Sequence, residues 1–371
     1  MKIKINRNQL VNAMKSAADI AGGKLSLTIL SYLRLETKGA DSVTITGTNL
    51  DITIERTVAC EVNVPGAATI PARLAMSIVS AMIAEEIEIA VDKDDGSCKA
   101  VITGGDARFR VGTMAASSFP KAVEVDGDCF VETSSNIMSA VSDVVHAASN
   151  DGTRRALQGV FITAENGRMT CVATDGRRLA SVVTDVSAGG KEIQGVILPV
   201  VAVRYLQKVF GGETGDAQME IVISKNGARF STSSGVVQTK LIDDAYPNWK
   251  CVIPRSSEVV VAVDRQELMD SVRLATISAS VDLPQVQIAF EPGSLVVNAA
   301  NSDVSDARTS FPIKYSGEPI VVNMQPHYLL DALAVSSQDE VTLKLSRNLS
   351  PVAIESEADG FLSVIMPIRN N

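Results

Sequence analysis

The sequence predicts an α+β fold in which one unit of two helices and several antiparallel strands occurs three times along the chain. Three observations support this prediction: an apolar helical stripe near the start of each third, a second helix introduced by proline, and a matching turn between strands. Equivalent markers are 126 to 131 residues apart in a chain of 371 residues. A constant period of this kind is typical of repeated structural units.

The first helix of each unit is predicted from apolar residues at i, i+1, i+4, i+7, i+8 and i+11, a spacing that forms one apolar face. Asn6 with Gln9, and Asp264 with Glu267, have the spacing of a capping box before the first and third stripes. The stripes are Leu10, Val11, Met14, Ala17, Ala18 and Ala21, then Ile137, Met138, Val141, Val144, Val145 and Ala148, then Leu268, Met269, Val272, Ala275, Thr276 and Ala279.

A second helix is expected after a proline in each unit, because the missing N–H of proline is tolerated in the first turn of a helix. The prolines are Pro71, Pro199 and Pro326, and the apolar faces are Leu74, Ile78 and Met82, then Val203, Leu206 and Phe210, then Leu329, Leu330 and Leu333. Alternating stretches such as VTITGTNLDITIERTV and MEIVISKNGARFST predict antiparallel strand pairs between the helices. Matching turns are expected at Thr48-Asn49, Thr174-Asp175 and Ala300-Asn301.

The repeats divide the chain into three expected domains, 1–120, 128–247 and 253–371. The predicted linkers follow Phe119-Pro120 and Tyr246-Pro247. Repetition alone is also compatible with a tandem array that has no shared function.

Composition limits the possible functions. The net charge is −9, whereas proteins that hold nucleic acid by contact affinity usually carry an excess of basic residues. No apolar run is long enough for a membrane span and no signal peptide is present, so we expect a cytoplasmic protein. The cysteines are odd in number and widely spaced, and we expect them to be reduced core residues: Cys60, Cys98, Cys129, Cys171 and Cys251.

A search for catalytic chemistry finds little. The two histidines, His146 and His327, lie in different repeats, and no hydrolase, zinc-peptidase, P-loop or dinucleotide motif occurs. We expect no metal site and no cofactor. Asp175 is a candidate for a catalytic carboxylate. Asn49 and Asn301 occupy the equivalent positions of the other repeats, however, which favours the interpretation of Asp175 as a turn residue.

The segments TNLDITIE, IPARLAMSI, TRRALQGV, ATDGRRLA, AYPNW, YLLDAL and VIMPIR resemble, in order and spacing, the β subunit of bacterial DNA polymerase III over essentially the whole chain. The resemblance implies a non-enzymatic clamp. Two protomers would form a six-domain homodimeric ring, with helices inside and sheets outside, that encircles duplex DNA of any sequence. The replicative polymerase, the clamp loader and repair proteins would dock on it through short linear motifs. Such a ring is held on DNA by its topology, which would reconcile an acidic protein with a DNA partner.

The resemblance also assigns residues by position. The implied peptide-binding pocket comprises Arg154, Leu157, Thr174, Gly176, Arg177, Leu179, Pro247, Val252, Tyr328, Pro351, Val364, Met366, Pro367, Ile368 and Arg369. The implied DNA contacts are Lys24, Arg73, Asn150, Arg154 and Arg155. The implied dimer interface comprises Leu74, Ile78, Phe109 and Val111 on one side and Thr276, Ile277, Asp303 and Asp306 on the other. Cys251 and Ala156 depart from the family pattern at the pocket, and Pro199-Val200-Val201 lacks the basic residues expected at a helix start.

Two alternatives remain open from the sequence alone. One is an enzyme in which Asp175 and Arg177 act on a small molecule in a cleft, although no base or metal completes that site. The other is a purely structural or adhesive repeat protein, although no export signal is present.

Overall fold

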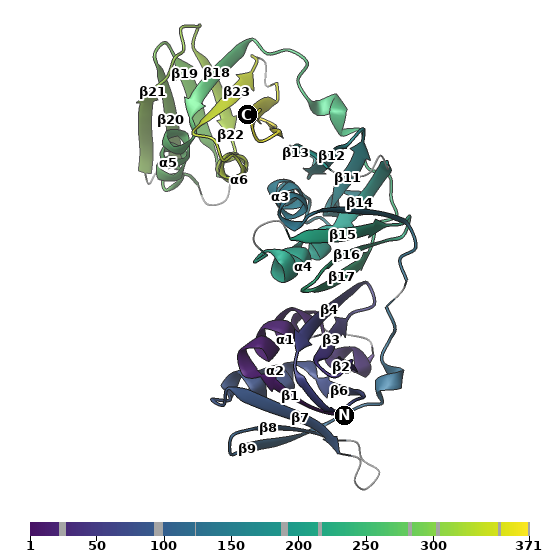
Figure 1. Cartoon of the computed structure of the whole chain (residues 1–371). Helices are drawn as coiled ribbons and strands as arrows, with labels where there is room; N and C mark the ends of the chain where they lie inside the picture. Colours follow the sequence, from purple (N-terminus) through teal and green to yellow (C-terminus); the bar gives the residue numbers. More distant parts are fainter. Residues whose placement is uncertain are drawn as a thin grey trace. The chain divides into compact units, whose positions relative to one another are not determined.

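A computed structural model describes residues 1–21, 27–92, 99–122, 124–186, 192–213, 217–280, 284–301, 305–347 and 350–369 (Figure 1). The chain forms two compact units, one of Met1–Met138 with Val201–Leu241 and the other of Ser139–Val200 with Ile242–Asn371. The division passes through the central repeat. Some strands of that repeat extend a sheet of the first repeat, while the others share a sheet with the third.

In the described part of the chain, a helix lies at each predicted apolar stripe: α1 Arg7–Ala21, α2 Ala72–Ala81, α3 Ser134–Val145, α4 Val200–Phe210, α5 Arg265–Thr276 and α6 Pro326–Val335. Helices α3 and α5 end about one turn before the last stripe residues, Ala148 and Ala279. The two predicted caps are confirmed. The Asn6 side chain accepts from the N–H groups of Asn8 and Gln9, and Asp264 accepts from the N–H of Glu267 at 2.8 Å.

The role of proline needs a small correction. Only Pro326 lies inside its helix, whereas Pro71 and Pro199 are the last residues of the preceding strands. The residue before a helix has extended backbone angles, which proline also adopts, and Pro71 has φ −61° and ψ 117°.

The first unit contains two antiparallel sheets. One has the order β5-β1-β7-β8-β9 and the other the order β10-β15-β16-β17-β4-β3-β2-β6, so that β17 of the central repeat pairs with β4 of the first. The strands are β1 Lys2–Asn6, β2 Tyr32–Lys38, β3 Ser42–Thr48, β4 Ile52–Ala59, β5 Glu61–Val64, β6 Ala67–Pro71, β7 Glu86–Asp92, β8 Lys99–Gly104, β9 Ala107–Gly112, β10 Asp128–Thr133, β15 Gln218–Ile223, β16 Gly227–Thr232 and β17 Gly235–Lys240.

The second unit is built in the same way. Its sheets have the orders β14-β11-β12-β13-β25-β24-β23-β18 and β21-β20-β19-β22, and β25 of the third repeat pairs with β13 of the central one. The strands are β11 Gly159–Glu165, β12 Arg168–Thr174, β13 Arg178–Asp185, β14 Ile193–Pro199, β18 Val259–Asp264, β19 Val286–Glu291, β20 Ser294–Asn301, β21 Ser305–Pro312, β22 Ile320–Met324, β23 Glu340–Leu345, β24 Val352–Ser356 and β25 Phe361–Ile365.

The predicted turns of the first two repeats have the same hydrogen bonds. Asn49 Oδ1 accepts from the N–H groups of Asp51 and Ile52, and Asp175 Oδ1 accepts from those of Arg177 and Arg178. This arrangement is an Asx turn, as the sequence predicts. The third turn is predicted at Ala300-Asn301, but both residues belong to β20 and pair with Asp306 and Ser305 on the next strand; residues 302–304 lie outside the described part of the chain.

Burial corrects two expectations. Leu74, predicted on the apolar face of α2, is 51% exposed. Among the described cysteines, all of which are free, only Cys171 is buried; Cys60 is partly exposed, and Cys129 and Cys251 are exposed. Cys129 lies on β10, at one end of its sheet, where one flank has no neighbouring strand to cover it. Cys98 lies outside the described residues.

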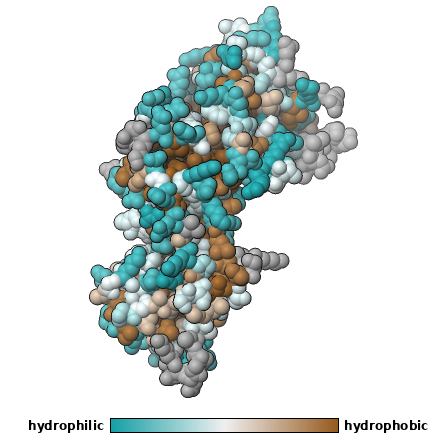
Figure 2. Space-filling model, turned by 90° about the vertical axis from the view of Figure 1, so that its right-hand side faces the viewer, coloured by the Kyte–Doolittle hydropathy of each residue, from teal (hydrophilic) through white to brown (hydrophobic). Residues whose placement is uncertain are grey.

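The surface carries polar and apolar side chains together, and the face drawn in Figure 2 shows both kinds intermixed. Among the helices of the described residues, none is long and apolar enough to cross a membrane.

Candidate functional site

The turn between β12 and β13 forms the centre of the candidate site. Thr174 Oγ1 donates to the carbonyl of Arg178 at 2.6 Å and accepts from the N–H of Gly176 at 3.1 Å. Gly176 has φ +88°, a left-handed conformation that glycine adopts without steric cost. Together with the Asx turn at Asp175, these bonds hold the turn in one conformation.

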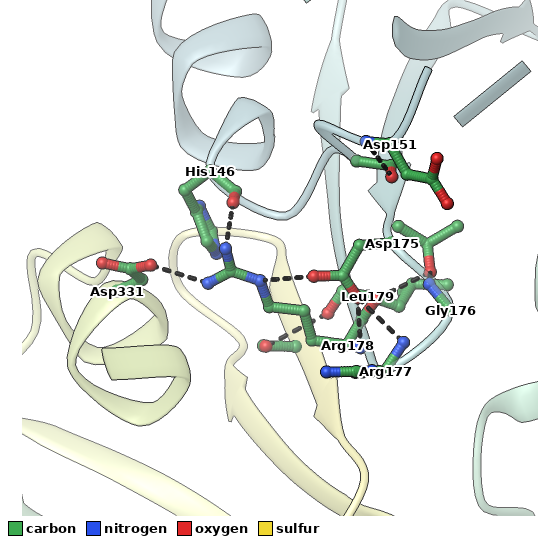
Figure 3. A network of polar contacts seen from close by, with 11 residues as sticks. His146, Asp151, Asp175, Gly176, Arg177, Arg178, Leu179 and Asp331 are labelled. Carbon is green, nitrogen blue, oxygen red and sulfur yellow. Dashed lines mark hydrogen bonds and ion pairs between the residues drawn. The ribbon is translucent and has the colours of Figure 1, made fainter. Parts of the chain in front are cut away.

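Arg178, at the first position of β13, anchors this turn to two helical segments (Figure 3). Its Nε donates to Asp175 Oδ2 at 3.2 Å, its Nη1 to Asp331 Oδ2 at 2.6 Å, and its Nη2 to the carbonyl of His146 at 2.6 Å. Asp331 lies on α6 and His146 directly follows α3. The guanidinium also stacks over the Tyr328 ring, 4.3 Å from its centroid. The arginine side chain is only 11% exposed and Asp175 17%, whereas Asp331 is 40% exposed, so the ion pair with Asp175 is better shielded from water than the one with Asp331.

His146 is neutral at physiological pH in this environment. Burial and the positive charge of Arg178 lower the pKa of His146 to about 4. His327, beside Tyr328 on α6, has a pKa lowered by the same two causes. Neither imidazole therefore carries the charge that an acid catalyst would need near pH 7.

Strands β13 and β25 supply the apolar part of the site. Leu179 faces Val364 across the strand pair, and both are 2% exposed. They form a core cluster with Val172, on which Phe161, Tyr246, Trp249, Ile253 and Leu362 pack. Leu157 is also buried, at 8%. Three predicted pocket residues, Leu157, Leu179 and Val364, thus lie in the core and can offer only an edge to a ligand.

Exposed apolar atoms come from the rim of the site. Met366 is 44% exposed, and its N–H donates to the carbonyl of Arg177 at 2.9 Å, which places it beside the turn. Val252, in the short 3-10 helix Trp249–Val252, is 46% exposed. Met366 and Val252 therefore offer flexible and branched apolar side chains at the surface.

The other predicted pocket residues lie in the same compact unit. Arg154 lies next to the turn, since a Cβ at Gly176 would stand 3.0 Å from its Nη1. The exposed ones are Arg154, Gly176, Arg177, Pro247 and Arg369. The partly exposed ones are Tyr328, Pro351, Pro367 and Ile368, and Thr174 is buried at 9%. At the two departures from the family pattern, Cys251 is exposed and Ala156 is partly exposed.

The sequence did not predict the role of Arg178, although a signal was present. Its counterpart in the first repeat is Ile52, which is 4% exposed. An arginine at a position where a related unit buries an isoleucine needs acidic partners or carbonyls nearby, and Asp175 is three residues away.

The residues predicted to contact DNA or a second protomer are distributed over both units. Lys24 and Asp303 lie outside the described residues, whereas Arg73, Asn150, Arg154, Arg155 and Asp306 are exposed. In the predicted dimer interface, Phe109 is 43% exposed and Ile277 81%, and Thr276 is partly exposed. Ile78 and Val111 are only 7% and 3% exposed, so both belong to the core of their own unit.

Comparisons with known proteins agree with a threefold repeat along the whole chain. Family models for the N-terminal, central and C-terminal domains of the DNA polymerase III beta subunit match residues 1–123, 133–248 and 250–369. The chain belongs to the DNA polymerase III beta-subunit family. The resemblance noted in the sequence is thereby confirmed, and so is the α+β fold of three clamp domains.

Relatives in this family match the chain from end to end. The beta sliding clamp of Chlamydia muridarum is 27% identical over 370 residues, which are 100% of this chain and 99% of that protein. A sliding clamp of Pseudomonas aeruginosa solved with griselimycin has a TM-score of 0.93 at 26% identity, with both chains covered completely. The Caulobacter crescentus clamp has a TM-score of 0.92 at 27% identity, covering 100% of this chain and 99% of that one.

Members of this family are non-catalytic sliding clamps of DNA replication, so the chain is a clamp and not an enzyme. The geometry agrees, because both carboxylate oxygens of Asp175 are occupied by the turn and by Arg178. The alternative of an adhesive repeat protein is wrong.

Proposed function

We propose that two copies of this chain close into a ring around duplex DNA and tether replication and repair proteins to it. The observation that carries the proposal is the match of all three domain models of one clamp family along the chain. Three repeats in each of two protomers supply six similar domains. A head-to-tail joint must close in this way to avoid an open filament.

The contact with DNA is proposed to be electrostatic and independent of sequence. A groove of about 700 Å³ in the first unit is lined by four basic side chains, those of Lys15, Arg56, Arg73 and Lys208, and by one acidic side chain, that of Asp19. Asp19 forms an ion pair with Lys208. The groove is therefore locally basic on a protein with a net charge of −9. Contacts of this kind attract phosphates, weaken with salt and read no bases, as sliding requires.

The proposed joint between protomers uses two strands at sheet ends. β9 ends the five-stranded sheet of the first unit and β21 ends the four-stranded sheet of the second. A terminal strand presents unpaired backbone groups to a partner strand. Phe109 on β9 and Leu74 on α2 are exposed apolar residues in one unit, and Ile277, at the end of α5, is exposed in the other. Arg108 and Arg110 on β9 are exposed, and β21 carries exposed Asp306 and Arg308, so Asp306 offers an acidic partner to the arginines of β9.

Partner proteins are proposed to dock through a short linear motif at the candidate site. Met366 and Val252 would contact the leucine and phenylalanine of the motif, and the Thr174 turn and the Arg369 side chain would hold a glutamine. Short segments bind weakly, at roughly micromolar Kd, and two sites on one ring would raise the effective concentration of tethered partners.

The oligomeric state tests this proposal. We expect the unmodified protein to sediment as a dimer and the double variant Phe109→Glu with Ile277→Glu as a folded monomer. Both positions are exposed, so the substitutions leave the core intact, unlike changes at buried Ile78. Val260→Glu, at a 60% exposed position on β18, is the matched control and should remain dimeric. A double variant that stays dimeric in dilute solution would remove this interface.

A further inference from the structure

A second pocket lies in the first unit, at the place where β4 pairs with β17. Its volume is about 510 Å³, and its walls are the turn after β3, the segment that follows Pro120, and the ends of β16 and β17. The Val125 side chain of that segment lies 3.3 Å from the position that a Cβ at Gly227 would take. The segment is thus packed against the start of β16.

The walls of this pocket repeat the frame of the candidate peptide site, 126 or 127 residues earlier in the sequence. The N–H of Lys240 donates to the carbonyl of Asp51 at 2.8 Å, as the N–H of Met366 donates to that of Arg177 at 2.9 Å. The wall residues Thr48, Leu50, Pro120 and Val125 correspond to Thr174, Gly176, Pro247 and Val252. The same backbone scaffold therefore occurs twice in one chain.

The side chains on the two scaffolds differ in a consistent way. Three apolar residues of the candidate peptide site, Leu179, Val364 and Met366, are replaced here by Thr53, Gln238 and Lys240. Lys240 pairs with Asp51 at 2.9 Å. Charges of both signs stand around the opening, with Lys121 and Lys225 against Glu124 and Asp126. A polar strand pair of this kind disfavours a motif of several apolar residues.

The backbone conformation and exposure of Leu50 give independent support for a binding role of this pocket. It has φ +76° and is 44% exposed, whereas its counterpart Gly176 has φ +88° without any side chain to clash. A leucine rarely adopts this conformation, and glycine would relieve it. A strained residue that also exposes apolar surface at the mouth of a pocket points to function rather than to stability.

We propose that this pocket binds a short extended peptide segment of a partner protein. In that segment, one aliphatic side chain lies between an acidic residue and a basic residue. The aliphatic group packs on Leu50 and Val125, and the flanking charges face the lysines and carboxylates of the rim. The inference rests on the proposed function only for the choice of a peptide as the ligand.

Methyl NMR on the full protein with labelled leucines tests the inference directly. The probes are two blocked pentapeptides, ETLTK and ETNTK, with a QLxLF-type peptide as reference. We expect ETLTK to shift the Leu50 methyl resonances in a saturable way, and ETNTK to bind about tenfold more weakly because the apolar contact is lost. Because Leu50→Gly removes the reporting methyl groups, its binding is followed by fluorescence anisotropy of labelled ETLTK, which should no longer bind this variant. The control Val131→Ala, at a 46% exposed position on β10, should bind ETLTK as the unmodified protein does.

Three results would overturn the inference. They are the absence of a saturable shift with ETLTK, equal binding of ETNTK, and an equal Leu50 shift with the QLxLF-type peptide. The last would make the pocket a second copy of the apolar-motif site. The proposed function is judged separately: if the QLxLF-type peptide fails to bind anywhere while ETLTK shifts Leu50, the candidate peptide site fails and this one stands.

Discussion

Replacing Arg178 by methionine tests the network that holds the candidate site together. The change removes the charge and leaves Asp175, Asp331 and the carbonyl of His146 without their common donor. Methionine keeps an unbranched apolar stem, so the loss of packing is small. We expect the second unit to lose stability and the peptide site to lose affinity together.

The magnitude follows from the exposure of each partner. Asp331 is 40% exposed, so its ion pair contributes at most about 1 kcal/mol. Asp175 is 17% exposed, and losing a charged hydrogen bond there costs about 1.5 to 3 kcal/mol. The Asp175 carboxylate keeps two backbone donors, which limits the penalty. We therefore expect Arg178→Met to lower the free energy of unfolding by about 3 kcal/mol, within the range for broken buried ion pairs.

Trp249 makes the assay specific to this unit. It is the single tryptophan of the chain and packs on the cluster of Val172, Leu179 and Val364. Its fluorescence during urea unfolding therefore reports on the second unit. Arg178→Lys should recover only part of the loss, because an ammonium group cannot serve three acceptors in the geometry of a guanidinium.

The matched control is Arg168→Met, which removes an exposed pair with Asp185 at 3.7 Å in the same unit and should change stability by less than about 0.5 kcal/mol. A double-mutant cycle should give a larger coupling for Arg178 with Asp175 than for Arg178 with Asp331. If Arg178→Met costs no more than the Arg168 control, the reasoning about this network is wrong.

Three further predictions concern single positions. The pKa of His146 is about 4 in the folded state and 6.5 ordinarily, so between these values only the unfolded state binds the proton. The free energy of unfolding, measured by tryptophan fluorescence, should therefore fall by about 2 kcal/mol between pH 7 and pH 5, and His146→Gln should remove that loss. Gly47→Ala would place a Cβ 2.3 Å from the carbonyl oxygen of Ala17 and should cost about 2 kcal/mol or more in thermal unfolding followed by circular dichroism, whereas Gly112→Ala, with open space around it, should not. Met366→Ala should weaken a labelled QLxLF-type peptide by about 1 to 2 kcal/mol in fluorescence anisotropy without changing stability, and unchanged binding would exclude Met366 as an anchor.

The sequence predicts the repeated elements well because their signals are local. Apolar spacing locates the helices, and the side chain of Asn49 or Asp175 is sufficient to form its own turn. The two turns form the same hydrogen bonds from equivalent positions. The repeat can therefore be predicted from the sequence, because equivalent residues form the same local structure.

Exposure could not be predicted in the same way, because it depends on which neighbouring strands and helices cover a residue. Leu74 and Ile78 belong to the same predicted apolar face of α2, yet Leu74 is exposed and Ile78 is buried. The role of Arg178 could not be predicted for a related reason. Two of its acceptors, on Asp331 and His146, lie far away in the sequence and meet it only after folding.

The measurement that tests the central claim most directly is retention on circular and linear DNA. The protein is loaded by the clamp loader onto nicked circular duplex, separated from free protein by gel filtration in high salt, and examined again after one restriction cut. A ring held by topology stays with the circle in high salt and is lost after the cut, because it slides off the ends. Equal retention on circle and linear duplex would show that contact affinity holds the protein, and would contradict the account.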